Sequence, residues 1–350
     1  MSLPKVAVVI LNWNGIDLLK HFLPYVLKHS SSNGDFSVDV VLADNASNDI
    51  SVAYTQEHFP SVQIVKNPIN NGYAGGYNAA LKHIKADVYV LVNSDIEVTE
   101  NWLQEPVMQM LRNPQIACVQ PKICAFSKRH LLEYAGGAGG FIDRLGYPFC
   151  RGRIFDTQEE DNKQYNMNTE IFWASGACIF IRSDCFWQAG GFDEDFFAHM
   201  EEIDLCWRLK NLGYICMYEP SSVVYHVGGG TLSAINPRKT YLNFRNNLFM
   251  LAKNLPSPFF TRTLLLRLVL DGIAAFKFLL QGSFRHFKAV FDAHMSFYAN
   301  FRKMIAKRKR NDALKKKFKL SAVYRRSIVF DYFVLGRKRF NALRSKDFYA

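Results

Sequence analysis

Six carboxylates are concentrated in one stretch of the chain, residues 190–213, with the sequence GGFDEDFFAHMEEIDLCWRLKNLG. The second half of this stretch predicts a helix, because Leu205, Leu209 and Leu212 fall on one apolar stripe. Glu202 lies three residues before Leu205 and shares that stripe. An apolar environment raises the pKa of a carboxylate toward the range in which it can act as a general base. We therefore expect Glu202 to take part in chemistry.

The other acids of this stretch have an ordinary structural interpretation. Glu201 aligns with Asp204 and Arg208 on a polar stripe, and the last two form a favourable i, i+4 pair. We interpret Asp193, Glu194 and Asp204 as capping groups and salt-bridge partners on a solvated face.

Polar residues follow four apolar runs, each of which predicts a buried strand. Helical segments alternate with these strands, so the sequence predicts an α/β fold with a mostly parallel sheet, and ligands gather at the carboxyl ends of such strands. Turn chemistry explains one or two polar endings, whereas four in succession favour a shared crevice. The runs and their endings are 6–11 with Asn12, 38–43 with Asp44 and Asn45, 62–65 with Asn67, and 88–92 with Asn93, Ser94 and Asp95.

These endings suggest specific ligands. Asp95 is well placed to bind a hard divalent cation that bridges a diphosphate, because such ions take oxygen ligands. His226 ends a further apolar run at 223–226, and it either supplies a second ligand through its imidazole or is structural. Asp44 and Asn45 could read the edge of a pyrimidine base, where a carboxylate accepts a hydrogen bond from a ring N–H.

Two stretches are rich in glycine. Residues 70–78, NNGYAGGYN, predict a loop that opens a helix, and Gly72, Gly75 and Gly76 would let its backbone approach a phosphate or sugar closely. The spacing does not match G-x-G-x-x-G, so a dinucleotide-binding fingerprint is not supported. Residues 136–152 predict a second loop.

Composition and charge divide the chain into two parts. The 350 residues are 49% hydrophobic and 21% charged, which is typical of a globular protein. Residues 241–350 contain 24 Lys and Arg against 5 Asp and Glu, whereas residues 1–240 have a net charge of −7. We predict an enzyme body at 1–240 and a basic helical extension at 241–350. The seven cysteines all precede residue 240 and contain no C-x-x-C pair, so we interpret them as reduced core residues.

The extension has the character of a membrane-surface segment. Residues 259–281 predict an amphipathic helix, and its four charges favour a position in the headgroup region over a membrane span. The basic runs 307–310 and 315–317 would each add about 1 kcal/mol per Lys or Arg of attraction to an anionic surface. Packing on the body is a close second interpretation, compatible with the first, and nucleic-acid binding is a distant third. Since the N-terminus lacks a signal-peptide pattern, we expect a cytoplasmic protein, peripheral at the inner face of the cell membrane.

Taken together, the motifs resemble the inverting glycosyltransferases of family 2, and most closely their rhamnosyltransferase-like branch. The resemblance covers about residues 4–250 and implies a Rossmann-like GT-A fold, a nucleoside-diphosphate sugar as donor, and a Mg²⁺ or Mn²⁺ ion. The Q-x-x-R-W motif and the membrane spans of the processive members are not found, which implies that one sugar is added at a time. The motifs are VVILNWNG, DNAS, NNGYAGGYN, NSD, WASGA, GGFDEDFFAHMEEIDLCWR and YHVGGGT.

The resemblance also implies roles for the matching residues. Asp95 matches the metal-binding aspartate of a D-x-D-like triplet that begins here with Asn, and His226 matches a histidine that closes the metal site. Glu202 matches the general base, with Glu201 as the fallback. We assign donor binding to Asn12, Asp44, Asn45, Gly72, Gly75, Asn78, Asn93 and Ser94. We assign acceptor binding to Trp173, Ser175, Gly176 and Asp193, although a core position for Trp173 is equally compatible with the sequence.

The sequence thus predicts transfer of one sugar, from dTDP-rhamnose or a UDP-sugar, to a hydroxyl of a lipid-linked or polysaccharide acceptor. The reaction would be a single displacement in which Glu202 takes the hydroxyl proton. One alternative is a non-catalytic module of the same fold that binds a sugar nucleotide or glycan, but the acids Asp95, Glu201 and Glu202 argue against it. Another is a nucleic-acid-binding protein led by its basic extension, which would leave the acidic front unexplained.

Overall fold

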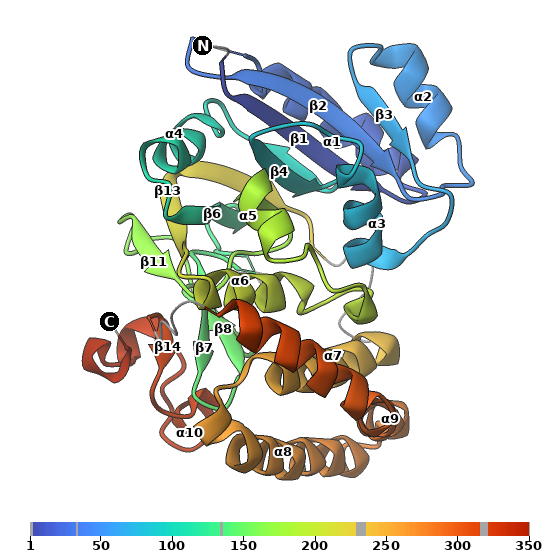
Figure 1. Ribbon diagram of the computed structural model, residues 1–350. Coiled ribbons are helices and arrows are strands. Elements are labelled where there is room, and N and C mark those ends of the chain that lie inside the picture. The colour runs from blue at the N-terminus through green and yellow to red at the C-terminus, as the bar shows by residue number, and fades with distance from the viewer. Residues whose placement is uncertain (1–2, 33, 134–135, 229–235, 316–320, 350) are drawn as a thin grey trace.

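The computed structural model describes residues 3–32, 34–133, 136–228, 236–315 and 321–349. Within these residues, helices cover both faces of a large mixed sheet, and a small second sheet and the C-terminal helices lie beside it (Figure 1). The α/β class predicted from the sequence is confirmed.

The large sheet has the strand order β11-β13-β6-β12-β4-β1-β2-β3, with β5 paired to β13. The four predicted runs are parallel neighbours, and β12 enters antiparallel between β4 and β6. Because β13 runs parallel to β6, the carboxyl ends of β1, β2, β4 and β13 share one edge of the sheet. The strands are β1 (Lys5–Asn12), β2 (Ser37–Asp44), β3 (Gln63–Lys66), β4 (Val88–Asn93), β5 (Ile96–Val98), β6 (Ile116–Ala125), β11 (Thr169–Ile171), β12 (Cys178–Arg182) and β13 (Ile215–His226).

Alternate residues of β1 face two separate cores, as the two-residue period of a strand requires. Val6, Val8 and Ile10 pack with α1 and α4, whereas Ala7 and Val9 pack with α3, α5 and α6. A continuous apolar run therefore suits this strand, which is covered on both faces. The helices are α1 (Ile16–His29), α2 (Ser51–His58), α3 (Gly72–Leu81), α4 (Gln104–Arg112), α5 (Ser183–Gln188) and α6 (Glu201–Asn211).

The second glycine-rich stretch is not a loop throughout, so that prediction is wrong. It contains an antiparallel hairpin of β7 and β8, and β14 from near the C-terminus pairs with β7. Phe141 and Phe149 of the hairpin pack against Phe340 and Phe348, and this aromatic packing outweighs the turn-forming tendency of the glycines. The small sheet comprises β10 (Thr157–Gln158), β9 (Arg153–Ile154), β8 (Pro148–Cys150), β7 (Gly140–Asp143) and β14 (Val323–Tyr324).

The C-terminal helices form a layer next to α6, with α7 in contact with α6, α8 and α9 (Figure 1). In the part of the chain that the structure describes, no helix combines the length and apolar composition needed to cross a bilayer. Lys316 and Lys317 of the second basic run lie outside the described residues. These helices are α7 (Pro237–Asn254), α8 (Phe260–Leu280), α9 (Phe284–Leu314) and α10 (Ile328–Phe333).

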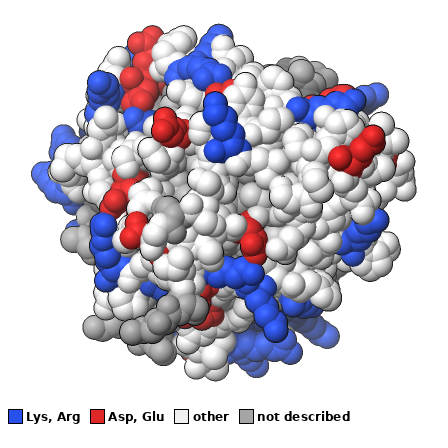
Figure 2. Space-filling view, turned by 90° about the horizontal axis from the view of Figure 1, so that it is seen from above, with Lys and Arg blue, Asp and Glu red and all other residues white. Residues whose placement is uncertain are grey.

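Charge is mixed on the opposite side of the molecule. Figure 2 shows the face seen from above, where Lys and Arg side chains are interspersed with Asp and Glu and uncharged surface lies between them. The described residues of this face therefore form no continuous basic stripe for a polyanion.

A substitution at Gly140 of β7 would test how closely the small sheet packs against the Trp173 ring. A Cβ atom at Gly140 would lie 2.1 Å from ring atoms of Trp173. We expect Gly140→Ala to lower the free energy of unfolding by about 1–3 kcal/mol, because the ring must move. Chemical denaturation measures this value.

Gly272→Ala in α8 is the matched control, since among the described residues no atom beyond its chain neighbours and the backbone of its own helix lies within 4 Å of the added Cβ. We expect this helical substitution to be neutral or to stabilise the protein by up to about 1 kcal/mol. Equal stability of both variants would show that the Trp173 ring is not tightly held.

Candidate active site

Side chains from separate strands meet at the carboxyl-end edge of the large sheet. Asn12 ends β1, Asp44 ends β2 and His226 ends β13. Asp95 lies two residues after β4, and its backbone carbonyl accepts a hydrogen bond from the Val227 N–H at 3.1 Å. The topology therefore brings together polar residues that are far apart in the sequence.

Asp95, His226 and Glu133 form a buried row of carboxylate, imidazole and carboxylate. His226 Nε2 lies 3.2 Å from Asp95 Oδ1, and His226 Nδ1 lies 3.4 Å from Glu133 Oε1. Burial lowers the pKa of His226, but the two carboxylates outweigh burial and raise this pKa to about 10. Burial raises the pKa of Asp95, and the hydrogen bond and charge of His226 outweigh that effect and lower it. Without an ion, His226 thus carries a proton between two acids.

This set of donors fits a hard divalent cation. Asp95 offers a carboxylate oxygen, and His226 offers a ring nitrogen once metal binding displaces its proton. Glu133 on the other ring nitrogen would orient the imidazole, as carboxylates commonly do behind metal-binding histidines. Gly228 leaves room for this acid, because a Cβ there would lie 2.9 Å from Glu133 Oε1. The rest of that motif, residues 229–231, lies outside the described residues.

Asn12 and Asp44 belong to a buried hydrogen-bond network at the ends of β1 and β2. Asn12 Nδ2 donates to Asp44 Oδ1 at 3.2 Å and to Ser51 Oγ at 2.8 Å. The Ser47 N–H donates to Asp44 Oδ2 at 3.1 Å. Asn12 Oδ1 is buried and has no hydrogen-bond partner among the described residues, which makes this oxygen a candidate for a ligand contact.

The first glycine-rich stretch lies mostly in α3, which begins at Gly72, so its prediction as a loop is wrong. The Phe197 carbonyl accepts hydrogen bonds from the N–H groups of Tyr73 and Ala74, at 2.8 and 3.2 Å. A Cβ at Gly72 would lie 2.4 Å from the same carbonyl. Protein atoms, and not an open groove, therefore meet the start of this helix.

Other predicted donor-binding residues also contact protein. Asn45 Nδ2 donates to the Gly72 carbonyl at 3.0 Å, and Asn78 Nδ2 donates to the Phe192 carbonyl at 2.8 Å. A Cβ at Gly75 would lie 2.6 Å from a side-chain atom one turn earlier in the chain. These contacts support a role for Asn45, Gly75 and Asn78 in holding α3 against its neighbours.

Glu201 and Glu202 begin α6 in different environments. Glu202 is half-buried, and burial raises its pKa to about 7, although hydrogen bonds from backbone groups, including that of Gly176, limit the rise. Glu201 is buried, and burial together with the charge of Glu202 raises its pKa well above the usual value. Of these two acids, Glu202 is therefore the one that can exchange a proton with solvent near neutral pH.

Gly176 links Glu202 to the end of β4. The Asn93 N–H donates to the carbonyl of Ala177, the residue that follows Gly176, at 2.9 Å. The side chains of Asn93 and Ser94 are half-buried at this edge. The turn that leads to Asp95 thus lies beside the loop that contacts Glu202.

A strained loop leads into α6. Phe197, His199 and Met200 have left-handed backbone conformations, with φ values of 63°, 68° and 71°. Such conformations cost about 1–3 kcal/mol each for residues other than glycine. Asn246 of α7 offsets this strain, since its Nδ2 lies 2.7–2.9 Å from three backbone carbonyls within residues 196–199. The C-terminal extension therefore fixes the direction of the first turn of α6.

The solvated face predicted for Asp193 and Asp204 is wrong. Asp204 is fully buried and the Asp193 side chain is 9% exposed, with Lys253 at 2.8 Å from Asp204 and 2.5 Å from Asp193. Arg208 also pairs with Asp204, and Lys307 with Asp193. Burial raises the pKa of Asp193, but the two lysines outweigh it and lower the pKa well below the usual value. A carboxylate neutralised in this way supports a structural role over acceptor binding.

Trp173 and Ser175 are also buried. Trp173 Nε1 donates to the Phe141 carbonyl at 2.8 Å, and its ring packs in the main core. The Ser175 N–H donates to Gln120 Oε1 at 2.8 Å. These contacts support core positions for both residues and leave Gly176 as the part of this segment that touches Glu202.

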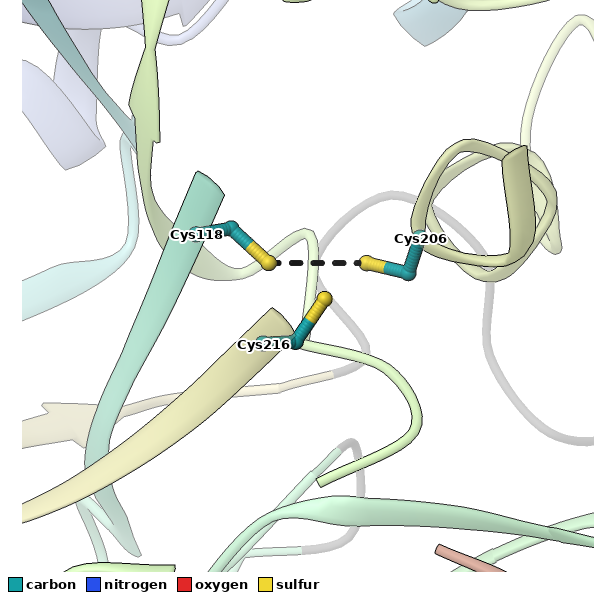
Figure 3. A group of neighbouring side chains, drawn as sticks. All are labelled: Cys118, Cys206 and Cys216. Atoms are coloured by element: carbon teal, nitrogen blue, oxygen red, sulfur yellow. Dashed lines mark hydrogen bonds between the residues drawn. The ribbon is translucent and has the colours of Figure 1, made fainter. Parts of the chain in front are cut away.

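Three thiols from separate elements lie together beside α6. Cys118 of β6, Cys206 of α6 and Cys216 of β13 point toward one another, with the first two sulfur atoms 3.9 Å apart (Figure 3). All seven cysteines are buried and free. Burial raises the pKa of Cys118, and it also contributes to a raised pKa at Cys216, so both thiols stay protonated. Since Cys206 follows Glu202 by one turn, the thiol cluster lies on the same side of α6 as that acid.

Sequence reasoning missed three residues of this site. Glu133 and Asn246 stand in no recognisable motif, and only the fold brings them to His226 and the loop before α6. Tyr73 stands within NNGYAGGYN, and its hydroxyl donates to the Gly176 carbonyl at 2.6 Å. The tyrosine in that motif was the one available signal.

Comparison with solved structures defines the fold. The chain is similar to GalNAc-T7 with UDP, GalNAc and Mn²⁺, with a TM-score of 0.56 and 17% identity over 72% of this chain and 48% of that one. It is also similar to the mannosyltransferase PcManGT from Pyrobaculum calidifontis in complex with GDP-Man and Mn²⁺, with a TM-score of 0.51 and 15% identity over 90% of this chain and 86% of that one. The chain has the GT-A fold of glycosyltransferases.

Comparison of sequences shows what the chain is similar to. Residues 7–135 match the family described as Glycosyl transferase family 2, which confirms the predicted resemblance to that family. It is 27% identical over 206 residues to N-acetylglucosaminyl-diphospho-decaprenol L-rhamnosyltransferase of Mycobacterium tuberculosis, which is 54% of this chain and 66% of that protein. It is 30% identical over 193 residues to N-acetylgalactosaminyltransferase 4 of Drosophila melanogaster, which is 53% of this chain and 29% of that protein. The match spans less than two thirds of either relative.

Asn246 offers a test of the loop before α6. We expect Asn246→Leu to lower the free energy of unfolding by about 1–3 kcal/mol, because buried carbonyls lose their donor. Denaturant titration measures the loss.

Asn300→Leu in α9 is the control, since Asn300 Nδ2 bonds only to the Ser296 carbonyl one turn earlier among the described contacts. We expect a change within about 0.5 kcal/mol. If both variants were equally stable, Asn246 would not hold the strained loop.

Proposed function

We propose that this protein is an inverting, metal-dependent glycosyltransferase that moves one sugar from a nucleoside-diphosphate sugar to a hydroxyl of a lipid-linked or polysaccharide acceptor. The observation that carries the proposal is the half-buried Glu202, with a pKa near neutrality, beside the sheet edge that holds Asp95 and His226. The family 2 match supports the same activity. The name of the mycobacterial relative supports rhamnose as the transferred sugar, so dTDP-rhamnose is one candidate donor and a UDP-sugar is the other.

Asp95 and His226 would hold a Mg²⁺ or Mn²⁺ ion. Both structural neighbours named above were solved with Mn²⁺, which supports a divalent ion here. When bound, the ion supplies positive charge that stabilises the departing nucleoside diphosphate. Glu133 keeps the His226 ring in the orientation that a metal ligand needs.

Glu202 is the proposed general base. It accepts the proton of the acceptor hydroxyl while the hydroxyl oxygen bonds to the anomeric carbon and the bond to the diphosphate breaks on the opposite face. The configuration at this carbon is therefore inverted. Glu201, kept protonated by burial, adds no second charge beside the base.

Donor recognition is assigned to the network of Asn12 and Asp44. The unpartnered Asn12 Oδ1 would accept a hydrogen bond from the nucleotide-sugar donor, and Asp44 would accept one from its nucleobase. The half-buried Asn93 and Ser94 directly precede Asp95, the proposed metal ligand, and would contact the sugar or ribose. We also propose that the protein acts as a cytoplasmic, peripheral enzyme at the inner face of the cell membrane, where a lipid-linked acceptor would be found.

The base assignment predicts a selective defect. We expect Glu202→Gln to reduce transfer by about 10²–10⁴-fold, because the variant cannot accept a proton. The increase in melting temperature caused by a nucleoside diphosphate with Mn²⁺, which reports its binding, should be nearly unchanged. Loss of transfer and binding to the same degree would contradict the assignment.

Glu201→Gln is the matched comparison, because Glu201 is the neighbouring buried acid. We expect it to retain more activity than Glu202→Gln. The reverse order would move the base to Glu201, and unchanged activity in both variants would refute the catalytic proposal.

The pKa of Glu202 predicts the pH dependence of transfer. A base must be ionised, so kcat/KM should rise about tenfold per pH unit below about pH 7 and level off above it. Initial rates of sugar transfer between pH 5.5 and 8.5 measure this profile. A flat profile across that range would show that the ionisation of Glu202 does not limit the reaction.

A further inference from the structure

The helix α8 packs against the protein with its polar side inward. Arg267 and Asp271 are buried, and Arg267 donates to the Leu145 carbonyl at 2.9 Å and lies over the Tyr147 ring. Arg267 Nη2 lies 3.4 Å from Asp271 Oδ1, and His294 Nε2 of α9 lies 3.5 Å from Asp271 Oδ2. These polar contacts add to the apolar contacts of Leu264 and Leu268, which pack with the main core, and together they fix which side of α8 faces the protein.

The outward side of α8 is correspondingly apolar. Val269 is 60% exposed, Ile273 is 62% exposed and Leu280 is 73% exposed. The spacing of the exposed residues keeps them on one face of the helix. This face comprises Leu265, Leu266, Val269, Ile273, Phe276 and Leu280.

α10 extends the same apolar surface. Lys277 of α8 lies over the Phe333 ring of α10 at 5.4 Å, and the two helices lie together at the lower edge in Figure 1. Phe333 is 55% exposed and Val334 is 65% exposed. A patch of this kind, built from two helices, is unusual on a protein surface that contacts only water.

Charge around the patch indicates its partner. Arg262 and Lys277 are exposed beside the apolar face of α8, and Lys338 follows α10. The one acid of each helix is turned inward, with Asp271 held by Arg267 and Asp331 by Arg337. A second copy of this chain would bring cations against cations across a twofold interface, whereas anionic headgroups complement them.

We propose that the outward faces of α8 and α10 form the membrane-contact surface of this protein, with their apolar side chains among the lipid chains and Arg262, Lys277 and Lys338 at the headgroups. The proposal deepens the proposed function, since it rests on an acceptor held at a membrane. The sequence assigned membrane attraction to the basic run 307–310 as well. Lys307 instead pairs with Asp193 and Arg308 is buried, so neither of these two residues is available to lipid headgroups.

Vesicle flotation with the full chain tests the surface. We expect binding to phosphatidylcholine vesicles that contain phosphatidylglycerol, and weaker binding without it. Val269→Glu combined with Ile273→Glu should reduce binding about tenfold or more, because charge cannot enter the acyl boundary. Leu3→Glu combined with Met167→Glu is the matched control at exposed sites elsewhere, and should bind as the unaltered protein does.

The melting temperature and Mn²⁺-dependent binding of UDP or dTDP show whether each variant is folded. If the glutamate pair does not fold, Val269→Ser with Ile273→Ser replaces it. Absence of vesicle binding, or equal binding by the patch and control variants, would overturn the proposal. Self-association that the patch variant abolishes, without vesicle binding, would assign the surface to a second copy. Vesicle binding without any sugar transfer would refute the proposed activity and leave this surface standing.

Discussion

The buried Lys253 connects the two electrostatic halves of this protein. Its ammonium group lies between Asp193, before the strained loop, and Asp204, on α6. Removing a partner from such a site leaves an uncompensated buried charge, which typically costs about 3–5 kcal/mol. The acidic front and the basic C-terminal helices are therefore complementary parts of one structure. The charge asymmetry of the sequence is partly satisfied within the molecule.

This arrangement gives the C-terminal helices a direct part in the site. Asn246 and Lys253 stand on the same helix, α7, and together they hold the loop and first turn that present Glu202. The sheet supplies Asp95 and His226 from the other side. A candidate general base and a candidate metal site can thus be positioned by two rigid parts that meet at Gly176 and the end of β4.

The sequence predicted those parts of the fold that have a local pattern. Continuous apolar runs located β1, β2 and β4, and the polar endings placed Asn12, Asp44 and Asp95 at one edge. Helical periodicity located α6, but it assigned Glu202 to the buried stripe and Glu201 to the polar stripe, whereas Glu201 is buried and Glu202 is half-buried. Asp204 is polar and yet buried, because its partner Lys253 comes from a segment 49 residues later. Periodicity cannot reveal such a distant partner.

Glu133 and Asn246 were missed for the same reason. Each acts through a contact far away in the chain, and neither stands in a pattern of its own. The glycine-rich stretches were misjudged because glycine permits a loop but also permits close packing, as Gly140 shows beneath the Trp173 ring. In α8 the sequence showed two faces, but only the packed structure shows that Arg267 and Asp271 point inward.

The central claim is that Asp95, His226 and Glu202 serve one pocket for a metal-bound sugar nucleotide. A crystal structure with Mn²⁺ and a bound nucleoside diphosphate, with the ion located by its anomalous scattering, tests this most directly. The account predicts that Mn²⁺ contacts Asp95 and His226 and that the nucleobase of the nucleotide lies beside Asp44. It also predicts that the diphosphate leaves space in front of Glu202 for an acceptor. A nucleotide bound at another edge of the sheet, or an ion held by other residues, would contradict it.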